Sequence, residues 1–146
     1  MLKPQIKVSA VGSSTDNGAG CCVILEYEDI LGRKSKSVIT HPIGIADEVL
    51  ADVQAAHLGL GAIIRPMRKE AHVVLVVTDN VVSALSGVTI DSNVMAELNR
   101  WVSYYKDLDI TVAARSDIPG NDMAIECANS QKGFYKKTRV CDVDSC

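Results

Sequence analysis

The apolar run at residues 73–77, which continues into Thr78-Asp79, constrains the fold of this chain most strongly. The five residues are Val-Val-Leu-Val-Val, with no alternation of apolar and polar side chains. A short run of this kind predicts a strand that is buried on both faces. Such a strand belongs to a sheet with helices packed on each side, and here it ends on the carboxylate of Asp79.

Three further strands are predicted before this run, at residues 6–11, 21–27 and 34–40. The stretch 12–20 between the first two holds three glycines together with Ser, Thr, Asp and Asn, which predicts a turn. The connection at residues 29–33 predicts a hairpin. Three consecutive strands with short connections indicate an antiparallel meander.

Helical periodicity begins after the meander. Apolar residues recur at helical spacing from Asp47, a plausible N-cap, until Pro66 stops the helix. The remaining predicted elements are a short helix at 80–85, a longer helix that begins at Asp91 or Ser92, a strand at 110–114 and a final helix at 121–130. This order predicts an α/β domain over residues 1–130, with a five-stranded mixed sheet (a three-strand antiparallel meander plus two parallel strands) and helices on both faces. Residues 131–146 are polar and are expected to form a loose tail.

Composition limits the classes of function. The formal net charge of –3 gives no overall basic surplus of the kind that nucleic-acid binders usually carry. The basic residues do cluster locally, at residues 33–36, 65–69 and 132–139, either as solvated loops or as contacts to phosphates or an acidic partner. The sequence starts without a signal peptide and has no apolar run of about 20 residues, so we expect a soluble intracellular protein without a membrane partner.

The five cysteines, an odd number, fit a reducing compartment. Cys21 and Cys22 are adjacent on a predicted strand, so they should face opposite sides and not chelate together. Cys141 and Cys146 lie in the polar tail and suggest no role. The three histidines are scattered without ligand spacing, so we expect no zinc site.

Four short motifs occur in order along the chain. They are Val11-Gly12-Ser13 after the first strand, Asp52-Val53-Gln54-Ala55-Ala56 in the first helix, Thr78-Asp79 after the fourth strand, and Gly120-Asn121 leading to Ile125-Glu126 in the last helix. With the order of elements, these motifs make the chain resemble the ribonuclease H domains over residues 5 to 130. The resemblance implies the fold of that family, a mixed sheet with helices on both faces.

The resemblance also implies a damaged active site. In members of the family, four acidic side chains bind two Mg²⁺ ions. These ions activate water and stabilise the leaving oxygen. The matching positions here are Val11, Asp52, Asp79 and Ile125. Mg²⁺ requires oxygen ligands, which valine and isoleucine do not provide. Asp52 and Asp79 are therefore expected to be vestigial catalytic and metal-binding residues, with weak metal binding or none.

Two uncertainties of alignment stay open at this point. A helix register shifted by one turn would make Glu48 the surviving acid in place of Asp52. A shifted set of acids that includes Asp16, Asp122 or the neighbouring Glu126 is a conceivable replacement for the missing ligands.

Three functions are consistent with these residues. The first is a catalytically inactive pseudoenzyme that serves as a structural or protein-interaction module, like the degenerate copies of this fold in viral and retroelement polyproteins. It needs no cofactor and predicts a protein partner or self-association. The second is an atypical ribonuclease H that uses Mg²⁺ or Mn²⁺ to cleave RNA in RNA–DNA hybrids, and the third is a nucleic-acid binder without catalysis. The missing acids and the net acidity favour the first.

Overall fold

The computed structural model describes residues 5–28, 31–62, 72–79, 81–82, 109–114 and 118–140. Within them lie eight labelled elements: β1 (Gln5–Thr15), β2 (Gly18–Glu28), β3 (Lys34–Gly44), α1 (Glu48–Gly61), β4 (His72–Val77), β5 (Asp109–Ala114), α5 (Asn121–Ser130) and β6 (Phe134–Val140). Val81 and Val82 continue from β4 in a helical turn whose amides bond to the carbonyl of Thr78. The predicted helix that begins at Asp91 or Ser92, the rest of the short helix at 80–85, and the two C-terminal cysteines lie outside the described residues.

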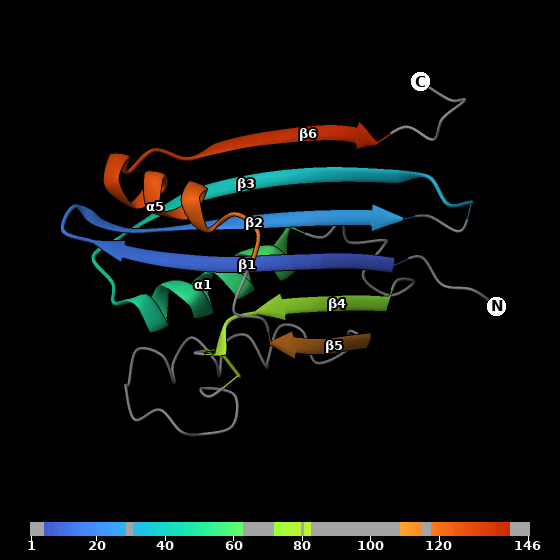
Figure 1. The fold of residues 1–146 in the computed structure, drawn as a ribbon, viewed down its shortest axis with the longest axis horizontal. Coiled ribbons are helices and arrows are strands. Elements are labelled where there is room, and N and C mark those ends of the chain that lie inside the picture. The colour runs from blue at the N-terminus through green and yellow to red at the C-terminus, as the bar shows by residue number, and fades with distance from the viewer. Residues whose placement is uncertain are drawn as a thin grey trace.

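All six described strands form one sheet in the order β5-β4-β1-β2-β3-β6 (Figure 1). The first three strands pair antiparallel as a meander, β4 lies parallel to β1, and β5 lies parallel to β4. The predicted five-stranded mixed sheet is therefore confirmed. Its continuous apolar strand, β4, lies inside the sheet between β1 and β5 as the sequence predicts.

The sixth strand corrects the expectation of a loose tail after residue 130. β6 pairs antiparallel with β3, from Phe134 opposite Thr40 to Val140 opposite Lys34. The amide of Phe134 also donates a hydrogen bond to Oγ1 of Thr40 (2.8 Å). A solvated edge strand needs no apolar face, so its sequence shows no hydrophobic periodicity that would reveal it.

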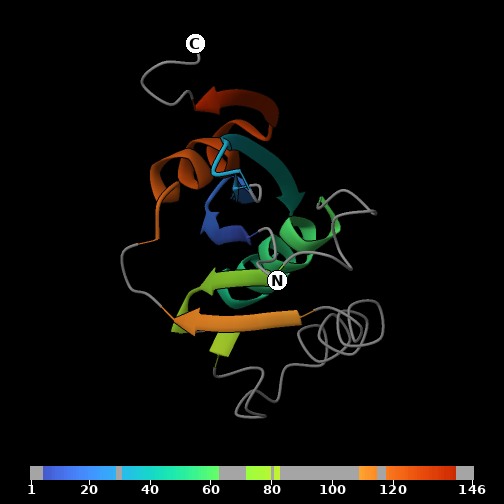
Figure 2. The same cartoon turned by 90° about the vertical axis from the view of Figure 1, so that its right-hand side faces the viewer.

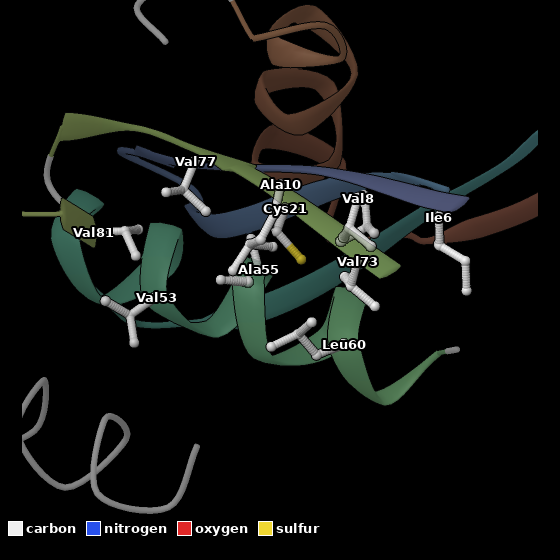
Figure 3. Packing of buried hydrophobic residues seen from close by; sticks show 13 residues of the cluster. Ile6, Val8, Ala10, Cys21, Val53, Ala55, Leu60, Val73, Val77 and Val81 are labelled. Carbon is white, nitrogen blue, oxygen red and sulfur yellow. The ribbon is translucent and has the colours of Figure 1, made fainter. Parts of the chain in front are cut away.

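Two apolar clusters occupy the two faces of the sheet. The larger one packs between the sheet and α1 and includes Val8, Val53, Leu60, Val73 and Leu75 (Figure 3). The smaller one lies on the face that α5 covers. Figure 2 shows α1 and α5 on opposite sides of the sheet, as the sequence predicts for helices that cover both faces.

Two glycines allow the backbones of α1 and α5 to lie close to the sheet. A Cβ on Gly12 would lie 2.5 Å from the backbone nitrogen of Asp52 in α1, and one on Gly20 would lie 2.6 Å from the backbone nitrogen of Ala128 in α5. The predicted turn at 12–20 is therefore mostly strand, and only Asp16 and Asn17 make the turn between β1 and β2. These glycines permit close approach of another backbone, which composition alone does not distinguish from turn chemistry.

The first helix begins where its sequence predicts but ends earlier than predicted. The side chain of Asp47 accepts a hydrogen bond from the amide of Leu50 (2.8 Å), so Asp47 is the N-cap that the pattern predicts. The helix ends at Gly61, before Pro66 is reached. None of the helices in the described part of the chain has the length and apolar character needed to cross a membrane.

The hydroxyl of Ser9 is the one buried side-chain polar atom of the described residues that has no hydrogen-bond partner. Ser9 is fully buried on β1 between its cross-strand neighbours Ile24 and Val76. A buried hydroxyl without a partner destabilises the folded state. We expect Ser9→Ala to raise the free energy of unfolding by about 1 kcal/mol in urea denaturation. Ser14→Ala is the control and should not stabilise, because the Ser14 hydroxyl bonds to the carbonyl of Ala46; equal effects of the two substitutions would contradict the prediction.

Candidate functional site

A buried carboxylate joins the first helix to two strands. Asp52 is 1% exposed, in the second turn of α1. Its Oδ1 accepts a hydrogen bond from the backbone amide of Gly12 in β1 (2.6 Å). Its Oδ2 accepts a hydrogen bond from the hydroxyl of Thr78, directly after β4 (2.9 Å). Asp52 therefore connects α1 to β1 and to the end of β4.

The local sequence explains this contact. Gly12 has no side chain, so the backbone of α1 approaches β1 closely enough for a carboxylate to reach the strand's amide. Thr78 follows the last residue of the parallel strand β4, where its hydroxyl faces α1. Sequence reasoning did not assign Gly12 and Thr78 to the site, although both stand in the motifs that it singled out. The sequence signal for them was a glycine directly after Val11 and a threonine directly before Asp79, within two of the four motifs.

Val11, the neighbour of Gly12, packs on the opposite face of the sheet. Its side chain is 5% exposed and lies in the smaller apolar cluster. The buried members of that cluster are Val11, Cys22, Ile24, Val76, Ile118 and Ala124, with Val38, Val74 and Met123 packed against them. The position therefore contributes to the packing of α5 on the sheet.

The other acid of the predicted pair is on the surface. Asp79 is exposed directly after Thr78, at the start of the helical turn that contains Val81. Glu48, the alternative to Asp52 in a shifted register, is also exposed, in the first turn of α1. The structure thus places Asp52, and not Glu48, against β1 and the end of β4.

The last helix presents its remaining acids to solvent. α5 buries Ala124, Cys127 and Ala128 against the sheet, whereas Asp122 and Glu126 are exposed and Ile125 is 37% exposed. Asp16, in the turn between β1 and β2, is exposed as well. Its neighbour Asn17 bonds to Asn129 near the C-terminal end of α5 (3.4 Å).

These acids do not form a cluster. Asp16 lies four residues beyond Gly12 along an extended hairpin, which corresponds to roughly 13 Å. Within the described ranges, which include every candidate acid named above, no three His, Cys, Asp or Glu side chains are close enough to hold a metal ion. The conceivable set of Asp16, Asp52, Asp79 and Asp122 is therefore not assembled in this conformation.

Three of the cysteines, Cys21, Cys22 and Cys127, are buried. Cys21 belongs to the cluster under α1 and Cys22 to the one under α5, so the prediction that they face opposite sides is confirmed. All three thiols are free. Burial raises the pKa of Cys21 to about 12 and that of Cys22 to about 11, and burial also raises the pKa of Cys127. Thiols with raised pKa values are poor nucleophiles at neutral pH, so these cysteines are structural.

The raised thiol pKa values predict a loss of stability in alkaline solution. An unfolded thiol releases its proton near pH 9, while the folded protein keeps the protons of Cys21 and Cys22 to about pH 12 and about pH 11. Their contribution is therefore complete below pH 9 and falls by about 1.4 kcal/mol per pH unit for each thiol above it. Urea denaturation between pH 9 and 11 should give a shallower decline for Cys22→Ala than for the wild type, and parallel declines would contradict this assignment.

Comparison with solved structures decides the fold. LC9-RNase H1, described as a type 1 RNase H with the type 2 active-site motif, superposes with a TM-score of 0.74 at 16% identity, over 96% of this chain and 79% of that one. The RNase H1 of the halophilic archaeon Halobacterium salinarum superposes with a TM-score of 0.59 at 18% identity, over 88% and 99%. The fold is ribonuclease H-like. LC11-RNase H1, solved in complex with an RNA/DNA hybrid, gives a TM-score of 0.56 at 16% identity, over 88% and 98%.

The ribonuclease H-like fold agrees with the resemblance drawn from the four motifs. No family model matches the sequence, and no curated protein matches it either. Identities of 16–18% carry the fold and not the activity. The function must therefore be argued from the residues of this chain's own site.

Proposed function

We propose that this chain is a catalytically silent ribonuclease H-like domain that acts as a protein-interaction module. The observation that carries the proposal is the environment of Val11. Its side chain stands where the resemblance implies a metal-binding acid, and it is buried in an apolar cluster of six residues. A valine in such packing supplies no ligand, and it leaves no solvated space beside it for a hydrated Mg²⁺ ion.

The other positions support the same conclusion. Ile125, at the second missing acid, offers no oxygen on the exposed face of α5. The two oxygens of Asp52 accept hydrogen bonds from Gly12 and Thr78. This carboxylate therefore joins α1 to β1 and to the end of β4 without a metal. The residues present therefore do not fit a two-metal centre, and we derive no cleavage step through one.

Thermal unfolding with and without divalent ions tests the proposal. A metal that binds the folded state only, at 100 times its dissociation constant, stabilises the fold by about 2.7 kcal/mol. We expect no shift in Tm at about 10 mM Mg²⁺ or Mn²⁺ relative to NaCl of equal ionic strength. Asp79→Asn is the matched control, because Asp79 is exposed and its loss should not unfold the protein. A stabilisation by Mn²⁺ that disappears in Asp79→Asn would overturn the proposal.

A further inference from the structure

The strand β6 ends the sheet and has one described neighbour. It pairs with β3 on its inner side, and within the described residues no strand pairs with its outer side (Figure 1). An edge strand presents a row of backbone N–H and C=O groups to which another extended chain can pair. β6 offers seven residues for such pairing, from Phe134 to Val140.

The outer two strands and the residues just before them carry basic side chains and no acidic ones. Residues 31–44 and 131–140 contain no Asp or Glu, and they carry seven of the 15 basic residues: Arg33, Lys34, Lys36, Lys132, Lys136, Lys137 and Arg139. All 18 acidic residues lie elsewhere in the chain. An overall acidic protein therefore has a basic sheet edge.

The strand register gives acidic neighbours to the basic residues of β3 but not to those of β6. On the inner side, Lys34 and Lys36 of β3 stand opposite Glu28 and Glu26 of β2, and such opposite charges across strands attract. The register of β6 instead places Lys136 opposite Val38, with Lys137 and Arg139 opposite two serines of β3. The basic residues of β6 therefore have no acid at the opposite register positions of β3, and an acidic partner on the outer side would supply one.

The register also favours an extended peptide over a ligand that lies on one face. Side chains alternate along a strand, so Phe134 and Lys136 share one face of the sheet, whereas Tyr135 and Lys137 have positions on the other. Phe134 is 47% exposed and Tyr135 is 63% exposed. An added strand reaches both faces at once, whereas a single-stranded nucleic acid follows one surface. A second copy of β6 is disfavoured, because it would set basic residues against basic residues.

We propose that the edge of β6 binds an acidic, extended segment of another protein, which adds to the sheet as a seventh strand. Backbone hydrogen bonds along β6 give the affinity, and carboxylates opposite Lys136, Lys137 and Arg139 select the partner. Apolar residues of the segment pack beside Phe134 and Tyr135. This inference rests on the proposed role as an interaction module and names the surface and the chemistry of its partner.

Fluorescence anisotropy with a designed peptide tests the edge. The probe is the labelled, end-capped peptide Val-Glu-Thr-Glu-Glu-Val-Val, which places three carboxylates against the three basic positions in an antiparallel pairing. Saturable binding that weakens with salt is expected, and a peptide with Lys in place of each Glu should not bind. N-methylation of one alternate set of peptide amides should abolish binding while the other set is tolerated, because only one edge of an added strand faces β6. Equal effects of the two sets would overturn strand addition.

Protein variants locate the site. Lys136→Gln should weaken the peptide's affinity by about twofold to fivefold, as expected for an exposed charge pair. Lys7→Gln removes the same charge from β1, three strands away and roughly 14 Å from β6, and should leave the affinity unchanged. Equal losses in the two variants, no saturable binding, or tighter binding of a seven-nucleotide oligothymidylate than of the peptide would each reject this partner. None of these results depends on cleavage or metal binding. The proposed peptide binding at β6 can therefore be disproved while the proposed loss of catalysis remains valid.

Discussion

Replacing Gly12 with alanine is expected to lower the free energy of unfolding by about 3 kcal/mol or more. The added Cβ would lie 2.5 Å from the backbone nitrogen of Asp52 and 2.6 Å from the carbonyl oxygen of Ala51. Both atoms belong to the backbone of α1, so no side-chain rotation relieves the clash and the whole helix must shift. The shift would also lengthen the hydrogen bond from the Gly12 amide to Asp52.

Urea denaturation of Gly12→Ala measures this loss. Gly32→Ala is the matched control, because a Cβ on Gly32 has no atom within 4 Å. Its positive φ of 81° makes alanine strained there, at a cost of about 1 kcal/mol. If Gly12→Ala lowers the free energy of unfolding no more than Gly32→Ala does, the packing of α1 does not depend on this close approach.

Val11→Asp is expected to destabilise the fold by about 3–5 kcal/mol at pH 7. The substitution restores the acid that the resemblance implies, but it puts a charge among Cys22, Ile24 and Val76. Burial without a partner raises the pKa of the introduced carboxyl above its unfolded value near 4. The variant is therefore least impaired below pH 4 and loses stability as the pH rises from 4 to the raised pKa, because the unfolded carboxyl ionises over this range while the buried one keeps its proton.

Val11→Asn separates the charge from the shape of the new side chain. Asparagine has nearly the same size and is polar without titrating, so its cost should stay constant between pH 4 and 7. The difference between the two variants, measured by urea denaturation at both pH values, reports the buried charge alone. A small cost for Val11→Asp that does not change with pH would show that this position is solvated, and would remove the main argument against a metal centre.

The elements with a strong local pattern were predictable from the sequence. The apolar strand before Asp79 and the helix capped by Asp47 follow from periodicity and capping chemistry, which depend on neighbouring residues only. β6 was missed because an edge strand in water is held by backbone pairing to β3, and Phe134 to Val140 carry no apolar alternation. Backbone hydrogen bonds to a distant strand do not require particular side chains, so the sequence of β6 does not reveal them.

The candidate site was predictable in part. The motifs placed Asp52 and Asp79 near each other in the fold, yet only Asp52 is buried. The partners of Asp52, the amide of Gly12 and the hydroxyl of Thr78, lie 40 and 26 residues away along the chain. Long-range contacts of this kind come from how the helix packs on the sheet, so a local pattern does not reveal them. The packing of Val11 under α5 is also a long-range contact, so the sequence did not predict it.

Cleavage of a labelled RNA–DNA hybrid tests whether this domain has lost its catalytic activity. It should be made with the wild-type protein in Mg²⁺ and in Mn²⁺, beside Asp79→Asn and an active ribonuclease H as a positive control. A catalytically silent domain gives no product above the Asp79→Asn background in either metal. Product formation by the wild type that is lost in Asp79→Asn would contradict the account, and would mean that other ligands replace Val11 in a working metal centre.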